Sequence, residues 1–180
     1  VDDEVVIRIE IVPFTGVIPN DDFIVYYPSG LRVGYHISEA FTVELSTTFA
    51  PDSESDLGGF LTETVQLKRA DIQETFSSFH TANVLWAPAY GKISLLGTKL
   101  THFETYVGIG FGLFATRNVP EDNPDGEEEM KPAGNTVLGF RWFISDMFNI
   151  RTEYRQHFFQ KFGGGVSIPV ELSLGLGVTI

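Results

Sequence analysis

The stretch HFETYVGIGFGLFAT, residues His102–Thr116, alternates between two kinds of residue. One set of alternate positions is largely bulky and apolar, whereas the other contains a glutamate and three glycines. Strict alternation predicts a β-strand with two different environments, because successive side chains of a strand point to opposite faces. The first set is Phe103, Thr105, Val107, Ile109, Phe111, Leu113 and Ala115, and the second is His102, Glu104, Tyr106, Gly108, Gly110, Gly112 and Phe114.

The same alternation recurs along the chain and predicts eight strands. Most of these segments are close to the roughly 9–11 residues that cross a bilayer as a tilted strand. No apolar run reaches the roughly 18 residues that indicate a transmembrane helix. The predicted strands are Val5–Phe14, Leu31–Ile37, Phe41–Phe49, the weaker Phe79–Trp86, His102–Thr116, Asn135–Ile144, Asn149–Phe158 and Ile168–Ile180.

The connections between the predicted strands alternate in length. Long connections follow the first, third, fifth and seventh strands, whereas tight turns at Ser38–Ala40 and Ser145–Phe148 follow the second and sixth. The connection after the fourth strand, Ala87–Thr101, is longer, and we expect it to contain strand extension and a bend. Long extracellular loops and short periplasmic turns are typical of outer-membrane barrels, and an even strand count puts both termini on the periplasmic side.

The polar face of these strands carries equal numbers of arginines and glutamates, whereas the whole chain has a net charge of −12. This balance suits a barrel interior, because an unpaired buried charge costs several kcal/mol. The predicted strands contain arginine and no lysine, which favours forked, bidentate pairing. The predicted lumen network, structural in role, consists of Arg8, Glu10, Arg32, Glu44, Glu104, Arg141, Arg151, Glu153, Arg155 and Glu171.

Aromatic residues gather toward the ends of the predicted strands. This distribution predicts interfacial girdles, in which amphipathic rings lie at the level of the lipid headgroups. The predicted girdle residues include Phe14, Tyr26, Tyr27, Phe49, Trp86, Tyr90, Phe103, Trp142, Phe148 and Phe159.

Few residues of the chain suggest chemistry. The absence of cysteine excludes disulfides and thiolate metal sites. A strongly acidic chain without a basic stripe argues against nucleic acid as a partner. The acidic segment Pro120–Lys131 resembles a calcium loop only loosely, since Pro132 stands where the last glutamate ligand belongs. His36 and His157 fall on the inward face and are predicted to be structural, and no serine lies in a hydrolase signature. We therefore expect no enzyme, metal or cofactor.

Three segments carry a family resemblance. They are LWAPAYGKISLLGTKLTHFETYVGIGFGL (Leu85–Leu113), LGFRWFISDMFNIRTEYRQHFF (Leu138–Phe159) and VGYHISEAFTVEL (Val33–Leu45). They resemble a family of outer-membrane β-barrel domains of myxobacteria and related predatory or soil bacteria. The resemblance implies an OmpA-like eight-stranded barrel. Some similar proteins are envelope parts of surface-motility machinery, while most have no assigned activity.

We therefore predict one all-β domain over residues 1–180: an eight-stranded antiparallel transmembrane up-and-down barrel in a bacterial outer membrane, with both termini periplasmic. It is expected to be a structural anchor or interaction component of a cell-envelope assembly. The predicted partners are outer-membrane lipid, lipopolysaccharide and envelope proteins that bind the loops and Ala87–Thr101. Two alternatives stay open, a narrow outer-membrane channel and a soluble lipocalin-like barrel with an apolar interior.

Overall fold

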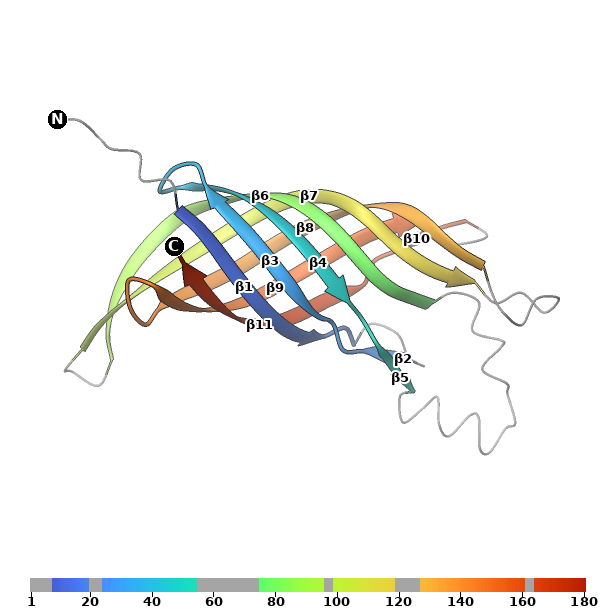
Figure 1. Cartoon of the computed structure of the whole chain (residues 1–180), viewed down its shortest axis with the longest axis horizontal. Helices are drawn as coiled ribbons and strands as arrows, with labels where there is room; N and C mark the ends of the chain where they lie inside the picture. Colours follow the sequence, from blue (N-terminus) through green and yellow to red (C-terminus); the bar gives the residue numbers. More distant parts are fainter. Residues whose placement is uncertain (1–7, 20–23, 55–74, 96–98, 119–126, 161–163) are drawn as a thin grey trace.

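The structure is a computed structural model that describes residues 8–19, 24–54, 75–95, 99–118, 127–160 and 164–180. Eight long antiparallel strands form a closed barrel (Figure 1), which confirms the predicted fold class. These strands are β1 (Arg8–Val17), β3 (Ser29–His36), β4 (Phe41–Phe49), β6 (Thr75–Leu95), β7 (Lys99–Asn118), β8 (Glu127–Phe143), β9 (Phe148–Gln160) and β11 (Val170–Thr179). Three short strands accompany them: β2 (Ile24–Tyr26), β5 (Asp52–Glu54) and β10 (Val166–Ser167).

Each long strand pairs with its neighbours in chain order, and the last strand pairs with the first. The amide of Ile9 donates to the carbonyl of Ile180 at 3.0 Å, and the amide of Ile180 donates back to the carbonyl of Ile9 at 2.8 Å. This closure is the up-and-down barrel topology, in which every long strand has two neighbours. Among the described residues, no helix is long and apolar enough to cross a membrane.

The two faces of the strands point as the alternation predicts. Apolar side chains point outward: Ile109 is 69% exposed and Phe111 is 74% exposed. Charged side chains such as Glu44 and Arg151 point inward and are fully buried. The barrel thus places its polar residues inside and its apolar residues outside, the reverse of an ordinary water-soluble domain.

One end of the barrel holds the start of β1, the end of β11 and the tight turns after β3 and β8, and the other end holds the strand ends that flank the long connections (Figure 1). In each of two tight turns a serine hydroxyl accepts a hydrogen bond from a backbone amide. Ser38 accepts from Phe41, and Ser145 accepts from Phe148, both at 3.1 Å. These serines close the turns that the sequence predicts, as serine commonly does at such positions. We call the two ends of the barrel the turn end and the loop end.

The strand β6 is much longer than the predicted segment, β7 is a few residues longer, and the strand extension expected between them is present. The weak segment Phe79–Trp86 is only the middle of β6, and most of Ala87–Thr101 belongs to the two strands, with residues 96–98 outside the described part. Trp86 is the last residue of β6 that pairs with β4. Beyond it β6 pairs with β7 alone, while β7 stays paired with β8 as far as His102. Past His102, β6 and β7 form a two-stranded ribbon that extends past the other turns (Figure 1).

Two details of the sequence interpretation need correction. The long strands contain lysines, namely Lys92, Lys99 and Lys131, so arginine is not the only basic residue in the sheet. The acidic segment is not wholly a loop, because Glu127–Lys131 form the start of β8 and pair with the end of β7. The remainder of this acidic segment, residues 120–126, lies outside the described residues.

Candidate functional site

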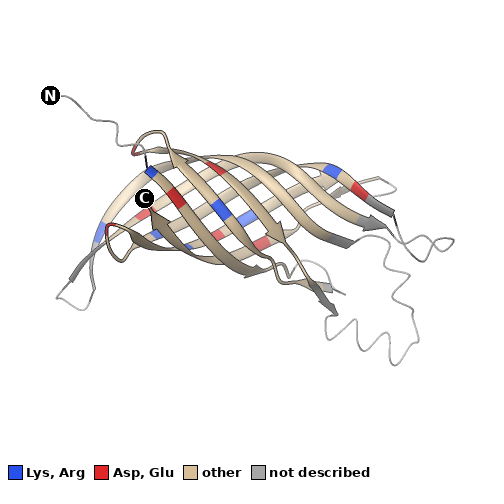
Figure 2. Ribbon diagram, viewed as in Figure 1, with Lys and Arg blue, Asp and Glu red and all other residues tan. Residues whose placement is uncertain are grey.

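The lumen is the place where the chain concentrates its polar chemistry. Arginine and glutamate positions lie on strands all around the barrel (Figure 2). Glycines on the same face leave room for them, since the interior of an eight-stranded barrel is only wide enough for side chains. A Cβ atom at Gly139 would lie 2.2 Å from Cζ of Tyr106, and one at Gly110 would lie 2.0 Å from Oδ1 of Asn83.

Arg151 on β9 is the centre of the lumen network. Its Nη2 lies 2.7 Å from Oε2 of Glu44 and also pairs with Glu153, while its Nη1 lies 3.4 Å from Oε2 of Glu10. Its Nε donates to the hydroxyl of Tyr106 at 2.9 Å, and that hydroxyl donates to Glu153 at 2.5 Å. One fully buried guanidinium thus connects carboxylates from three strands across the barrel.

Two further arginines extend the network toward the loop end. Arg155 contacts Oε1 of Glu44 at 2.5 Å and Oε2 of Glu153 at 2.6 Å. Arg32 lies 2.8 Å from Oε2 of Glu153 and 2.5 Å from Oε1 of Glu171. Because β3, β4, β9 and β11 all contribute, these pairs fix strands that are not neighbours in the sheet.

Toward the turn end, the network is organised around Glu10. Arg141 binds this carboxylate with two hydrogen bonds of 3.1 and 2.9 Å, and it also reaches Glu104 at 2.9 Å. Asn149 donates to Glu10 at 2.8 Å, and Nε2 of His36 lies 3.4 Å from the same carboxylate. The bidentate geometry that arginine was predicted to supply is present at this pair.

The structure brings together nine of the ten predicted network residues, and Arg8 is the exception. Arg8 begins β1 at the turn end, where its side chain is exposed to solvent, so its predicted place in the buried network was wrong. Glu104 lies at the edge of the network, with 13% of its side chain exposed. Within the described part of the chain, Lys131 is buried at the loop end and keeps the basic and acidic groups of the lumen in balance.

An aromatic layer, which the sequence interpretation missed, fills the lumen at the loop end. The rings of Phe79 and Phe114 stack at 4.5 Å, and those of Phe114 and Phe159 stack at 5.0 Å. His157 meets both Phe79 and Phe114 edge-on, and its Nε2 lies 3.3 Å from Oε2 of Glu171. The complete buried cluster is Ile18, Tyr26, Ala50, Phe79, Phe114, Ala133 and Phe159.

The girdle prediction was wrong for three residues. Phe14, Tyr26 and Phe159 are buried inside the barrel, at 6%, 2% and 6% exposure. Phe14 supports the network directly, since the guanidinium of Arg32 lies 3.5 Å from the centre of its ring. The signal was present in the alternation, because Phe114 stands in the inward set of its strand.

One hydrogen-bonded chain in the lumen has the connectivity of a hydrolytic triad. Oγ1 of Thr42 lies 2.9 Å from Nδ1 of His36, whose Nε2 faces Glu10. Thr42 is only 5% exposed, and the Glu10 carboxylate is already held by Arg141 and Arg151. This burial leaves a substrate no access to the hydroxyl, so the geometry favours a role in holding His36. In the described ranges, no three histidine or carboxylate side chains gather as a metal site would require.

No family model and no curated protein matches this sequence. Two solved structures resemble the fold over nearly its whole length. The N-terminal β-barrel domain of Pseudomonas aeruginosa OprF matches with a TM-score of 0.62 and 12% identity, covering 96% of this chain and 97% of that domain. Neisserial surface protein A matches with a TM-score of 0.52 and 11% identity, covering 96% and 94%.

The chain has the fold of the OmpA-like outer-membrane barrels. At these identities the likeness concerns the fold alone.

Proposed function

We propose that this chain is a non-catalytic barrel of a bacterial outer membrane that anchors a cell-envelope assembly. The observation that carries the proposal is the inside-out distribution of side chains. Large apolar residues such as Leu45, Ile109 and Leu174 are more than half exposed on the outer wall. An apolar surface of this extent is stable when lipid covers it, and a closed barrel leaves no strand edge unsatisfied in the bilayer.

The contents of the lumen argue against the two alternative functions. A soluble carrier of apolar ligands needs an apolar interior, whereas the middle of this lumen is filled by ion pairs around Arg151. A channel needs a continuous water path, whereas stacked rings around Phe114 pack in a buried cluster at the loop end of the described barrel. An eight-stranded barrel whose lumen is filled by its own side chains suits a mechanical role.

The proposal places both chain ends and the short turns in the periplasm, and the long connections outside. The ribbon of β6 and β7 would then extend into the periplasm and supply a contact surface for envelope proteins. At the base of this ribbon the ring of Tyr90 stacks on that of His102 at 5.5 Å, and Tyr90 is 62% exposed. The connection with myxobacterial barrel domains and with motility belongs to this proposal and rests on the sequence resemblance.

Cell fractionation followed by electrophoresis tests the location. We expect the chain in the outer-membrane fraction, and we expect an unheated sample to migrate faster than a heated one, because the barrel stays folded in detergent. Recovery as a soluble monomer with identical migration in both samples would refute the membrane placement.

Photo-crosslinking in cells tests the anchoring role. A photoreactive amino acid in place of Tyr90 should capture a defined envelope protein, whereas the same group in place of Ile109 on the outer wall should capture lipid. If the Tyr90 position captures no protein while Ile109 captures lipid, the barrel is in the membrane but the ribbon is not its anchoring surface.

A further inference from the structure

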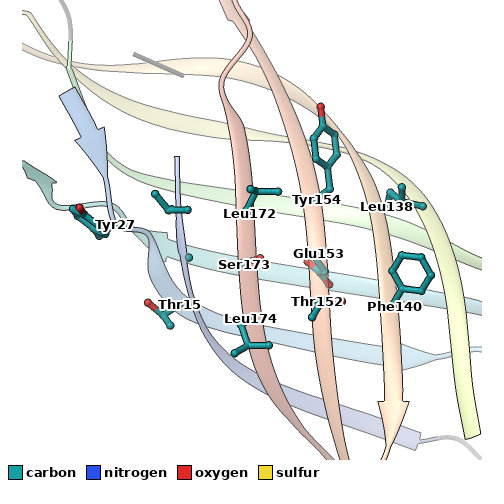
Figure 3. A pocket seen from close by; sticks show the side chains of 12 residues that line it. Thr15, Tyr27, Leu138, Phe140, Thr152, Glu153, Tyr154, Leu172, Ser173 and Leu174 are labelled. Atoms are coloured by element: carbon teal, nitrogen blue, oxygen red, sulfur yellow. The ribbon is translucent and has the colours of Figure 1, made fainter. Parts of the chain in front are cut away.

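The outer wall contains a groove across four adjacent strands. It crosses β8, β9, β11 and β1, and it has a volume of about 590 Å³. Figure 3 shows its labelled side chains, with Tyr154 directed away from Thr152 along β9. The residues that line it are Thr15, Gly16, Val17, Tyr27, Leu138, Phe140, Thr152, Glu153, Tyr154, Leu172, Ser173 and Leu174.

The groove arises from the sizes of side chains that are adjacent across the sheet. In one cross-strand row, Thr152 lies between Phe140 and Leu174. In the next row, Tyr154 lies between Leu138 and Leu172. The short side chain of Thr152 is therefore surrounded by longer ones, because directly opposite side chains on a sheet are neighbours.

The surface of the groove is apolar, with hydroxyl groups as its outward polar atoms. These hydroxyls belong to Thr15, Tyr27, Thr152 and Tyr154. The one ionic residue of the lining, Glu153, faces the lumen, where arginines hold its carboxylate. A ligand in the groove would thus meet hydrocarbon and no outward-facing charge of the lining.

We infer that this groove binds one acyl chain of a membrane lipid. The inference rests on the proposed membrane location and goes beyond it, because it assigns a lipid to one place on the wall. The groove is continuous with the exposed apolar belt, so acyl chains are the molecules that surround it in a bilayer. A concave surface contacts more of a chain than the rest of the wall does, which favours a longer residence at this place.

A protein partner fits the groove less well than an acyl chain. A protein segment would bring backbone amides and carbonyls into a lining that offers few hydrogen bonds, and each unsatisfied group in lipid costs several kcal/mol. A hydrocarbon chain carries no such groups. The occupant is therefore assigned as one acyl chain of a membrane lipid, and the probe for it is a bilayer of two phospholipids, phosphatidylethanolamine and phosphatidylglycerol.

Filling the groove with the substitution Thr152→Phe tests the inference. The wild-type protein is released from bilayer discs of those two phospholipids, and native mass spectrometry measures how many lipids remain bound. We expect one retained phospholipid per wild-type barrel, and we expect the substitution to lower its retention about tenfold, because a phenyl ring occupies the space of several methylene groups.

The matched control is Thr47→Phe on β4, an outward position on the opposite wall, which should keep the wild-type retention. Equal retention in all three proteins, with normal heat-dependent migration, would overturn the groove assignment while the membrane barrel stands. Loss of heat-dependent migration in the wild-type protein would instead contradict the proposed function itself. If Thr152→Phe alone fails to fold, Thr152→Leu serves as the milder filling variant, and unchanged retention there has the same meaning.

Discussion

Replacing Arg151 with methionine is expected to lower the free energy of unfolding by about 3–5 kcal/mol. Methionine keeps much of the volume of the side chain but removes the charge that Glu10, Glu44 and Glu153 share. Removing one partner of a buried ion pair leaves the other uncompensated in a region that water does not reach. Urea unfolding of the protein in phospholipid vesicles, followed by tryptophan fluorescence, measures the change.

Two variants make this prediction specific. The substitution Glu104→Gln should lower the free energy of unfolding by only about 1 kcal/mol, since this side chain is partly exposed and one arginine, Arg141, binds it. Adding Glu44→Gln to the Arg151 variant should recover part of the loss, because it removes one of the carboxylates left without a partner. An Arg151→Met barrel as stable as the wild type would show that the network does not hold the strands together.

The substitution Phe114→Ala is expected to lower the free energy of unfolding by about 3–5 kcal/mol, the usual range for truncating a buried phenylalanine. Phe114 is fully buried and stacks on Phe79 and Phe159, so its removal leaves a cavity in the middle of the aromatic layer. The same unfolding measurement in vesicles reports the loss.

Phe111→Ala is the matched control, because this residue is on the same strand but points outward and is 74% exposed. Its truncation leaves no internal cavity, and we expect the free energy of unfolding to fall by less than about 1 kcal/mol. If the two variants lose equal stability, the loop end of the lumen is not packed as the structure places it.

The alternation in the sequence was enough to predict the barrel and the direction of most side chains. Each strand of an outer-membrane barrel alternates because its two faces meet lipid and lumen, so the pattern is a direct consequence of the environment. This is why Glu10, Glu44 and Arg151 were assigned to the interior correctly. The pattern does not report how far along the barrel axis a residue lies, and Arg8 was therefore assigned to the buried network although it stands at the rim.

The sequence predicted strand extension within Ala87–Thr101, but it did not reveal how far β6 and β7 continue. The turn-end extension passes Pro88 and a shift of register between Trp86 and Ala89, which interrupts the alternation. The pairing continues beyond this irregularity, with Tyr90 opposite Glu104 and Lys92 opposite His102. A β-bulge of this kind moves the alternation by one residue, so a strand read from periodicity ends where the bulge begins.

The aromatic layer was missed for a related reason. Aromatic residues near strand ends serve either as interfacial girdles outside or as a plug inside, and both positions are near the same end of a strand. Only the face of the strand on which each residue lies separates the two. Phe114 lies on the inward face of its strand, as Tyr106 does, whereas Trp142 and Phe49 lie on the exposed outer face.

The proposed barrel presents its apolar wall to lipid and encloses its charged face. The most direct measurement uses Ile109→Trp in a protein whose two native tryptophans, Trp86 and Trp142, are replaced by phenylalanine. In bilayers of phospholipid brominated at mid-chain, bromine quenches tryptophan fluorescence on contact, whereas acrylamide quenches tryptophan in water. We predict strong quenching by the brominated lipid and little by acrylamide. Efficient quenching by acrylamide with no effect of the brominated lipid would contradict the membrane-spanning barrel.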